Sequence, residues 1–294
     1  MFQKPVFRPT LLIKKIFILI FPILFLCNPA YAFRANGMKT PESFQIDPAT
    51  GIYYVSNIDG RPKAKDNNGF IAKLDPSGKP IDLHFIRGGK DGVTLHAPKG
   101  MVIVAESIYV TDIDTVRRFD KKTGKLLGTV DLSLLGARFL NDLATSPEGI
   151  LYVSDTNGNA IYRIDPGKNF QVTLAVRDSR LGNPNGMVYD TPRKRLIVVA
   201  SGTGNILGVD LKGNIFPLVP KKFHHLDGID FDREGNIIVS NFTKGEIYRI
   251  KGFNKVEVIK KNMVTPADIS FDSRNNQLLI PSFKGNLVFT HPMD

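Results

Sequence analysis

The hydrophobic residues of this chain fall into short runs that alternate with polar positions. Runs rich in β-branched and aromatic residues occupy positions 52–56, 107–111, 150–154 and 237–240, and turn-forming Gly, Asn and Pro residues separate them. A period of two residues, interrupted by turn residues, is typical of β-strands and hairpins. No segment keeps the 3.6-residue apolar period of a helix over helical length. The pattern therefore predicts an all-β protein.

The strand pattern recurs six times along the chain. The six units begin, in order, at Pro41, Pro98, Leu140, Pro184, Leu226 and Pro266. Their starts are separated by 57, 42, 44, 42 and 40 residues, and only the first interval carries a long polar insertion, at positions 61–68. A repeat of this length is typical of β-propellers, solenoids and other arrays.

Most units contain four predicted strands, which together indicate a six-bladed β-propeller. The last unit reaches the end of the sequence after three strands, whereas the stretch 33–40 precedes the first unit and has no partner within it. Placing this N-terminal stretch on the last blade closes the ring and removes an exposed sheet edge. We expect an all-β, six-bladed propeller closed in this way, and a monomer.

The first 32 residues read as a signal peptide. Four basic residues precede an apolar run at 16–26, and Ala30-Tyr31-Ala32 provides a small-x-small cleavage site before Phe33. As an uncleaved anchor, this run is too short to cross a hydrocarbon core as a helix. Cys27 would suggest a lipoprotein, but the bulky Leu26 precedes it. The prediction is a mature domain of residues 33–294, periplasmic or extracellular, with no integral membrane anchor after cleavage.

The composition of the mature chain excludes some function classes. Residues 33–294 carry 35 Lys and Arg against 28 Asp and Glu, a net charge of +7, and contain no cysteine. The basic residues are scattered and form no aromatic-interleaved patch, so we expect no nucleic-acid partner. Without cysteine, the fold must be stabilised by its core alone, which a chain of this size can provide.

When the six units are aligned, one position contains candidate site residues. The second position of the six units holds Glu42, Lys99, Asn141, Asn185, Asp227 and Ala267. Equivalent positions of the innermost strands form a ring around a propeller axis, so four oxygen-bearing side chains converge there. Such ligands suit a hard divalent cation, Ca²⁺ above all. As an alternative, these residues serve only as turn formers. Asp142 lies one residue outside the ring and is expected to take no part.

The segments around these positions resemble a known family. Residues 41–47, 141–142, 184–187 and 227–230 are similar, in order and spacing, to the signature segments of the gluconolactonase/regucalcin (senescence marker protein) family. The resemblance extends blade by blade over the mature chain. It implies a six-bladed propeller and hydrolysis of a lactone.

The resemblance also implies roles for single residues. It assigns the divalent ion, Ca²⁺ or another, to Glu42, Asn185 and Asp227, with Asn141 completing the site and binding substrate. It makes Asp227 the candidate general base, and Arg138 matches an arginine that contacts substrate. The expected function is a metal-dependent hydrolase of small lactones or related esters.

Other features of the sequence leave alternatives open. Lys99 is expected to bind an acidic group of the substrate, to place a cation near the ion, or to extend outward. The insertion at 57–69 forms either a lid or a solvated loop, and the composition favours the loop. His224 and His225 stand at the channel mouth or are simply exposed. The alternative function is a non-catalytic propeller of the NHL-repeat type that binds a protein or glycan through its top face.

Overall fold

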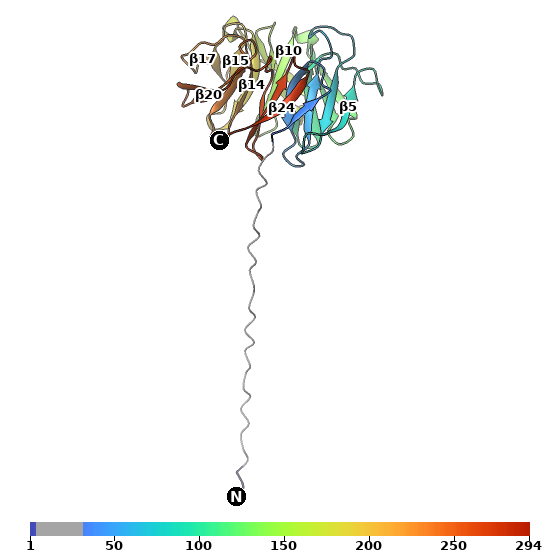
Figure 1. The fold of residues 1–294 in the computed structure, drawn as a ribbon, viewed down its shortest axis with the longest axis vertical. Helices are drawn as coiled ribbons and strands as arrows, with labels where there is room; N and C mark the ends of the chain where they lie inside the picture. Colours follow the sequence, from blue (N-terminus) through green and yellow to red (C-terminus); the bar gives the residue numbers. More distant parts are fainter. Residues whose placement is uncertain (4–31) are drawn as a thin grey trace.

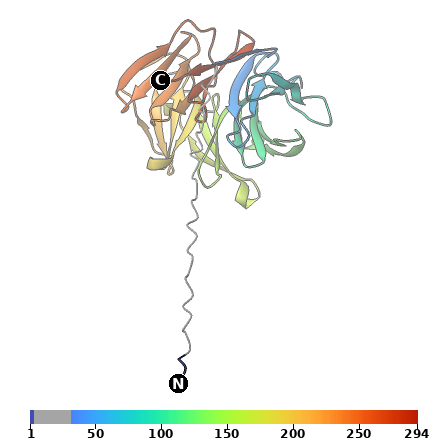
Figure 2. The ribbon, with the colours of Figure 1, turned by 60° about the horizontal axis from the view of Figure 1, so that its bottom comes forward.

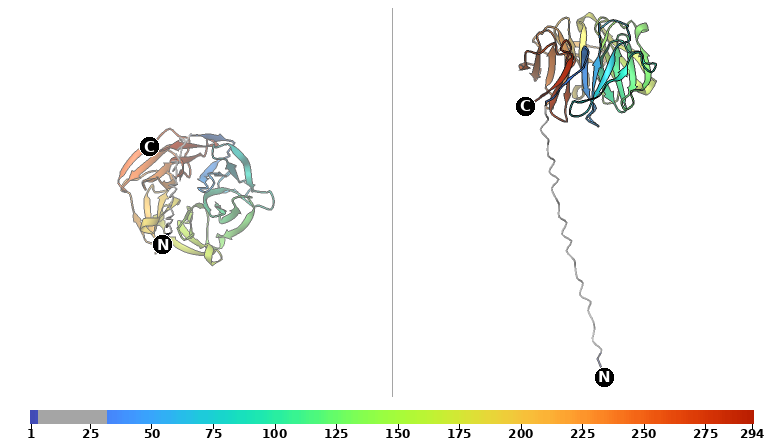
Figure 3. Two further views of the ribbon diagram at one scale, coloured as in Figure 1. Left: turned by 90° about the horizontal axis from the view of Figure 1, so that it is seen from below. Right: turned by 45° about the vertical axis from the view of Figure 1, so that its right-hand side comes forward.

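The computed structural model describes residues 1–3 and 32–294, so the predicted signal peptide lies almost entirely outside the described residues. Six four-stranded antiparallel sheets surround a central axis like the blades of a wheel (Figure 3). The predicted six-bladed propeller is therefore confirmed.

Each blade contributes one strand to each of four concentric positions. The innermost strands are β2 (Pro41–Ile46), β6 (Pro98–Val104), β10 (Leu140–Thr145), β14 (Pro184–Asp190), β18 (Leu226–Phe231) and β22 (Ser270–Asp272). The second strands are β3 (Tyr53–Asn57), β7 (Ser107–Asp112), β11 (Leu151–Asp155), β15 (Arg195–Ala200), β19 (Ile237–Asn241) and β23 (Gln277–Ser282).

The outer half of each blade follows the same order. The third strands are β4 (Phe70–Leu74), β8 (Thr115–Asp120), β12 (Ala160–Asp165), β16 (Ile206–Asp210), β20 (Glu246–Lys251) and β24 (Leu287–Pro292). The fourth strands are β5 (Pro80–Arg87), β9 (Leu126–Asp131), β13 (Gln171–Arg177), β17 (Ile215–Pro217), β21 (Lys255–Lys260) and β1 (Arg34–Asn36). Short 3-10 helices occur at Ser133–Leu135, Pro166–Lys168, Ser179–Leu181 and Thr191–Arg193.

The burial of the strands explains their sequence patterns. Every residue of the second strands β7, β11, β19 and β23 is buried, because neighbouring blades cover both faces of the sheet there. The outer strand β9 alternates between half-buried and exposed residues. Continuous apolar runs therefore mark the second strands, and the alternating pattern marks the blade edges.

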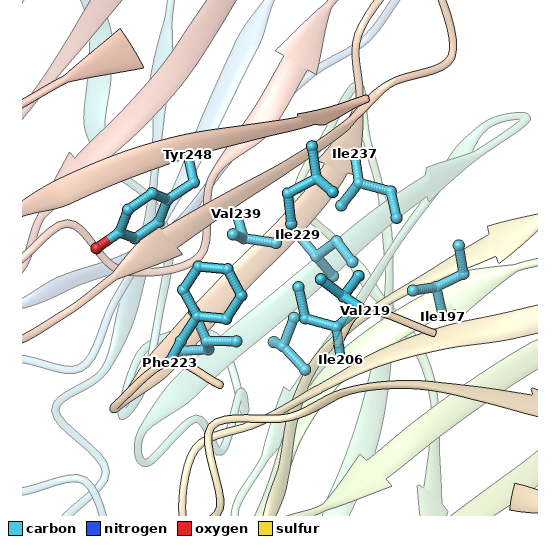
Figure 4. Close-up of a cluster of buried hydrophobic side chains, with 11 residues drawn as sticks. Ile197, Ile206, Val219, Phe223, Ile229, Ile237, Val239 and Tyr248 are labelled. Atoms are coloured by element: carbon cyan, nitrogen blue, oxygen red, sulfur yellow. The ribbon is translucent and has the colours of Figure 1, made fainter. Parts of the chain in front are cut away.

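The hydrophobic core is divided among the interfaces between blades. In the cluster between the fourth and fifth blades, Ile197 and Ile206 of one blade pack against Ile229, Val239 and Tyr248 of the next (Figure 4). Comparable clusters occur at the other interfaces. Burial of apolar surface at these interfaces is the main stabilising contribution in a chain without disulfides.

The N-terminal strand closes the ring, as predicted. β1 pairs antiparallel with β24, so the first and last described strands share one blade (Figures 1 and 2). The Phe33 N–H donates to Thr290 Oγ1 at 3.0 Å, and Phe33 O accepts from Thr290 N–H at 2.9 Å. The Phe33 ring also contacts Tyr53, with centroids 5.3 Å apart. A side chain at Gly78, which has φ +84°, would overlap this ring.

None of the described residues belongs to a helix with the length and hydropathy needed to span a membrane.

Candidate functional site

The predicted ring residues sit where the innermost strands depart from regular pairing. The register between first and second strands shifts between Pro41 and Phe44, and equivalent shifts occur at the starts of β6, β10, β14 and β18. The second and third residues of each unit fall inside these irregularities. A bulge redirects side chains and strengthens local twist, which here lets the ring position face the channel.

Glycine at the third position lets neighbouring blades approach closely. A Cβ atom on Gly186 would lie 2.4 Å from the backbone oxygen of Asp227, and one on Gly228 would lie 2.3 Å from the backbone nitrogen of Ile269. Both distances are too short for any side chain. The Asn-Gly and Asp-Gly pairs of the sequence thus place a ring ligand next to a residue without a side chain.

Hydroxyl groups of the second strands fix the ring backbone across blades. Ser154 Oγ accepts from Asp142 N–H at 2.9 Å and donates to Asn185 O at 2.8 Å. Ser240 Oγ links Gly228 N–H and Ala267 O in the same way. These bonds connect a ring residue of one blade to the second strand of the preceding one, so the ring is held by packing of the whole wheel.

Two carboxylates of the ring are buried with oxygens left unpaired. Glu42 is 5% exposed and Asp227 9% exposed, and Glu42 Oε2 and Asp227 Oδ1 have no hydrogen-bond partner among the described residues. Burial raises the pKa of Glu42 well above its ordinary value, and Asp227 and Asp268 raise it further. Burial and the Asp268 carboxylate raise the pKa of Asp227 to about 8. Lys99 lowers the pKa of Glu42, but less than burial raises it, so the two buried carboxylates still call for a proton or a further cation.

The two amides of the ring direct their nitrogens toward the protein. Asn141 Nδ2 donates to Thr156 Oγ1 at 3.1 Å, and this hydroxyl in turn donates to Pro184 O at 2.7 Å. Asn185 Nδ2 makes a long contact of 3.5 Å with Leu226 O. With their nitrogens used in this way, both side chains retain an amide oxygen as an acceptor.

Lys99 points into the channel. Its side chain is 1% exposed, its Nζ donates to Ala97 O at 3.0 Å, and it lies 4.5 Å from the centroid of the Phe139 ring. Burial lowers the pKa of Lys99 to about 8, and the Glu42 carboxylate opposes this shift. Of the three alternatives for Lys99, the one in which it extends outward is wrong, because its ammonium is buried and acts on the charge of Glu42. Its binding of an acidic substrate group stays a prediction.

A second tier of acids lies directly below the ring and was not predicted. Asp142 and Asp268 occupy the third position of their units, and both are buried. Burial and Asp268 raise the pKa of Asp142, while burial raises that of Asp268 to about 7. The expectation that Asp142 takes no part in ion binding stays a prediction, although its carboxyl is buried in the same channel. The signal was present in the repeat, where aspartate stands in a column otherwise occupied by Gly or Ser.

The chemistry of the ring fits a hard cation. Glu42 and Asp227 supply unpaired carboxylate oxygens, and Asn141 and Asn185 supply amide oxygens, the donor types that Ca²⁺ and Mg²⁺ prefer. In residues 1–3 and 32–294, no group of three or more His, Cys, Asp and Glu side chains is arranged to hold an ion. An ion at the ring would therefore rest on two carboxylates together with the amides.

The long insertion packs on the ring side of the wheel. Ile58 is buried, the Lys65 ammonium pairs with Asp114 at 2.5 Å, and Lys63 lies 5.2 Å from the Phe139 centroid. Asn67 accepts from Leu95 N–H at 2.8 Å. The segment reaches across the second blade to the loop that leads into Asn141, while Arg61, Lys63 and Asp66 are exposed. The choice between a lid and a solvated loop, of which the composition favours the loop, stays a prediction.

The remaining predicted residues lie at the surface of this face. Asp155 accepts hydrogen bonds from the backbone N–H groups of Arg138 and Phe139, at 3.0 and 2.9 Å, and the Arg138 side chain is exposed. His224 and His225 are both exposed, as either of their two interpretations requires.

Among the cavities in the described part of the chain are four that are not lined by Glu42, Asn185 or Asp227. One lies on the propeller axis below the ring, and the others lie between blades on the outer surface. The ring side chains Glu42, Asn141, Asn185 and Asp227 are all buried. Lys99 and Lys63 both lie over the Phe139 ring.

Solved structures with the same architecture share little sequence with this chain. Virginiamycin B lyase from Staphylococcus aureus matches with a TM-score of 0.65 at 13% identity, covering 90% of this chain and 99% of the lyase. Regucalcin, a calcium-binding protein from Agrobacterium tumefaciens strain C58, matches with a TM-score of 0.67 at 19% identity, covering 87% and 92%. A luciferin-regenerating enzyme matches with a TM-score of 0.64 at 16% identity, covering 90% and 96%. At these identities the similarity shows the fold alone.

A family model gives a more specific result. No curated protein matches the chain in sequence. The model of the SMP-30/gluconolactonase/LRE-like region, however, matches residues 71–282, well over half of the chain. This segment contains Asn141, Asn185 and Asp227, and Glu42 precedes it. The chain therefore belongs to the SMP-30/gluconolactonase/LRE-like family.

Proposed function

We propose that this protein is a divalent-metal-dependent hydrolase of small lactones or related esters. The observation that carries the proposal is the pair of buried, unpaired carboxylate oxygens on Glu42 and Asp227, next to the amide oxygens of Asn141 and Asn185. Family membership and the fold shared with a calcium-binding protein support the same proposal.

In the proposed site, Glu42, Asn185, Asp227 and Asn141 hold the ion, with Ca²⁺ the expected metal. A bound divalent ion supplies Lewis-acid polarisation of a carbonyl and lowers the pKa of coordinated water. The protein contributes a nearly dry surrounding, in which charge–charge interactions are stronger than in water. The hydroxyl bonds of Ser154 and Ser240 keep the ring backbone fixed, so the ligands need little reorganisation.

Asp227 is the proposed general base. Without an ion, burial and Asp268 raise the pKa of Asp227 to about 8. A bound ion would lower this pKa and favour the ionised carboxylate, the form that accepts a proton. Substrate binding is proposed for Asn141, Arg138 and Lys99. The exposed Arg138 can reach a ligand above the ring, whereas Lys99 acts from below the surface through its charge.

The ring side chains are buried, so a substrate needs a path to them. The ammonium groups of Lys63 and Lys99 both lie over the Phe139 ring, 5.2 and 4.5 Å from its centroid, and Lys63 belongs to the insertion. We propose that displacement of this insertion opens the ring to substrate. We also propose that the protein is exported and acts as a monomer in the periplasm or outside the cell.

The burial of the ring side chains favours a second candidate, a non-catalytic propeller that binds a protein or glycan through its top face. A panel of lactones and aryl esters, assayed with Ca²⁺ and with EDTA, separates the two functions. The hydrolase predicts turnover that EDTA removes, that Ca²⁺ restores and that Asp227→Asn abolishes. Exposed Asp91 is the matched control, because Asp91→Asn should leave turnover unchanged. Ca²⁺ binding without turnover of any member of the panel would establish the non-catalytic alternative.

A further inference from the structure

The wheel has two faces, and equivalent connections of all six blades reach the same face (Figure 3). The strands within each blade are antiparallel. The connections between blades, and those between second and third strands, therefore lie on the side where the innermost strands begin. The ring of Glu42, Asn141, Asn185 and Asp227 lies at these strand starts, so we call this side the ring face. The remaining connections lie on the opposite face.

The ring face has an excess of basic residues. Its connections contain twelve Lys and Arg residues against six Asp, and one of these six, Asp268, is buried in the channel. The connections and chain end of the opposite face contain ten Lys and Arg against seven Asp and Glu. All twelve basic residues of the ring face are exposed, namely Lys39, Arg61, Lys63, Lys65, Lys90, Arg138, Arg180, Lys221, Lys222, Lys244, Lys261 and Lys284. The fold thus brings to one face basic residues that are scattered along the sequence.

Most of these basic groups have no acidic partner within the protein. Among the described residues, Lys65 and Arg180 are the two that form ion pairs on this face, with Asp114 and Asp178. Ten ammonium or guanidinium groups are left against three acids near the surface. Uncompensated charge of one sign produces a potential that attracts groups of the opposite sign. The ring face therefore suits an anionic partner.

The basic residues surround the channel mouth. Each of the six connections between blades carries at least one of them, in chain order Lys39, Lys90, Arg138, Arg180, the pair Lys221 and Lys222, and Lys261. Equivalent connections of a repeat structure lie at equivalent heights, so these groups form a circle around the axis. A linear polyanion is matched by a stripe of basic residues, whereas a flat anionic surface can contact the whole circle at once.

Apolar side chains project from the same face. Leu134 is 94% exposed, the most exposed large hydrophobic residue of residues 32–294, and Leu135 beside it is 42% exposed. Val264, 56% exposed, lies in the connection three blades away, on the other side of the axis. Within residues 32–294, the connections of the opposite face hold one such residue, Leu211. A lipid surface binds basic groups at its headgroups and apolar side chains below them, and a soluble anion makes no use of the second kind.

We propose that the ring face docks on an anionic phospholipid surface, with the circle of Lys and Arg at the headgroups and Leu134, Leu135 and Val264 below them. Docking is peripheral and reversible, because it rests on charge and a few apolar side chains. It turns the mouth of the channel toward the lipid. The inference goes beyond the proposed hydrolase function and does not depend on it, since neither the ion nor turnover is involved.

Co-sedimentation with lipid vesicles in EDTA tests the proposal. The propeller of residues 33–294, which contains all six blades, is the protein to use, because the apolar run at 16–26 would bind lipid by itself. We expect binding to mixed phosphatidylglycerol and phosphatidylcholine vesicles, and binding at least about tenfold weaker to phosphatidylcholine alone. Raising the salt from about 0.1 M to about 1 M shortens the screening length from about 10 Å to about 3 Å and should release the protein.

Variants show which face docks. Lys90→Glu combined with Lys261→Glu should weaken binding to the anionic vesicles about 25-fold or more, because each basic residue near such a surface contributes about fivefold. Lys125→Glu combined with Lys168→Glu is the matched control, since it makes the same charge change at exposed lysines of the opposite face and should leave binding unchanged. Leu134→Ser should weaken binding several-fold, because less apolar surface enters the lipid. All these variants should melt like the wild type, since the side chains are exposed.

Three results would overturn the proposal. One is equal binding to neutral and anionic vesicles, or binding to neither. The second is an equal loss of binding in the ring-face and opposite-face double variants, which would show that net charge acts without a docking face. The third is binding to heparin that persists at a salt concentration that releases the anionic vesicles, which would make the partner a soluble polyanion.

Discussion

The carboxylate of Asp142 accepts a hydrogen bond of 2.6 Å from the backbone N–H of Met187, across the boundary between the third and fourth blades. Asp230 makes the same connection to Phe271 between the fifth and sixth blades, at 2.8 Å. These channel acids therefore contribute to blade packing as well as to the charge of the channel. For this reason Asp142 cannot serve as a neutral control for substitutions in the ring, and exposed Asp91 takes that role.

Replacing Asp227 with Asn should weaken divalent binding while the fold survives. The substitution keeps the shape of the side chain but removes one of the two ring carboxylates, and affinity for hard cations depends on carboxylate number. We expect Ca²⁺ affinity to fall about tenfold or more, and the Ca²⁺-dependent stabilisation to fall by about 1.4 kcal/mol for each tenfold change. Calorimetry and thermal unfolding with and without Ca²⁺ provide the measurement. Wild-type protein that binds no divalent ion would show that the ring residues are only structural.

Replacing Lys99 with Met should have the opposite effect. The ammonium lies beside Glu42 and opposes a second cation in the same channel, so its removal adds one net negative charge to the site. We expect Ca²⁺ affinity to rise about tenfold, because like charges a few ångströms apart in a buried site repel by more than 1.4 kcal/mol. Lys63→Met is the matched control, since this exposed lysine lies against the same Phe139 ring. A lower or unchanged affinity in Lys99→Met would contradict the interpretation of Lys99 as an internal competitor.

The stability of the metal-free protein should decrease as the pH rises. Burial raises the pKa of Asp227 to about 8 and that of Asp268 to about 7, whereas both carboxyls titrate near pH 4 when unfolded. The folded chain therefore holds more protons than the unfolded chain between about pH 4 and about pH 8, and stability is lost across that interval. Ca²⁺ competes with these protons, so its stabilising effect should grow over the same interval.

Thermal unfolding in EDTA and in Ca²⁺, at several values from about pH 5 to about pH 8, measures both effects. Asp227→Asn should flatten the pH dependence seen in EDTA, because one raised carboxyl is gone. A melting temperature in EDTA that increases from about pH 5 to about pH 8 would show that the channel acids are not protonated in the folded state.

Truncating Phe33 should loosen the closure of the ring. The half-buried ring contacts Tyr53 and Phe44, with centroids 5.3 and 6.2 Å away. Phe33→Ala should cost about 2 kcal/mol, less than the roughly 3–5 kcal/mol of a fully buried Phe, and lower the melting temperature by about 4–8 °C. Leu134→Ala, at a side chain that is 94% exposed, is the control. Equal melting temperatures for the two variants would mean that β1 closes the blade through its backbone alone.

The sequence predicted the fold and the ring for the same physical reason. A repeat of about forty residues places equivalent positions at equivalent heights on the axis, so the column of Glu42, Asn141, Asn185 and Asp227 could be identified without coordinates. Closure by the N-terminal strand followed from the missing strand of the last unit, and the structure confirms it.

The direction and surroundings of side chains could not be predicted from the repeat. Lys99 occupies a ring position, but only the structure shows that its ammonium bonds to Ala97 O inside the channel. Asp142 and Asp268 face the same channel because the strands are irregular at this point, and a regular strand would turn successive residues to opposite faces. The packing of the insertion likewise depends on Phe139, which is distant in sequence.

The pairing of β1 with β24 makes the order of synthesis matter. Five blades consist of consecutive strands and are complete once residue 260 has been made, but the sixth requires residues 34–36 and 287–292 together. Until the last residues emerge, the wheel stays open and exposes unpaired strand edges, which are sites of aggregation and chaperone contact. In a prematurely terminated chain these strand edges stay unpaired. Only the full-length polypeptide reaches a state without them, so truncated products should be recognisable to proteases as incomplete.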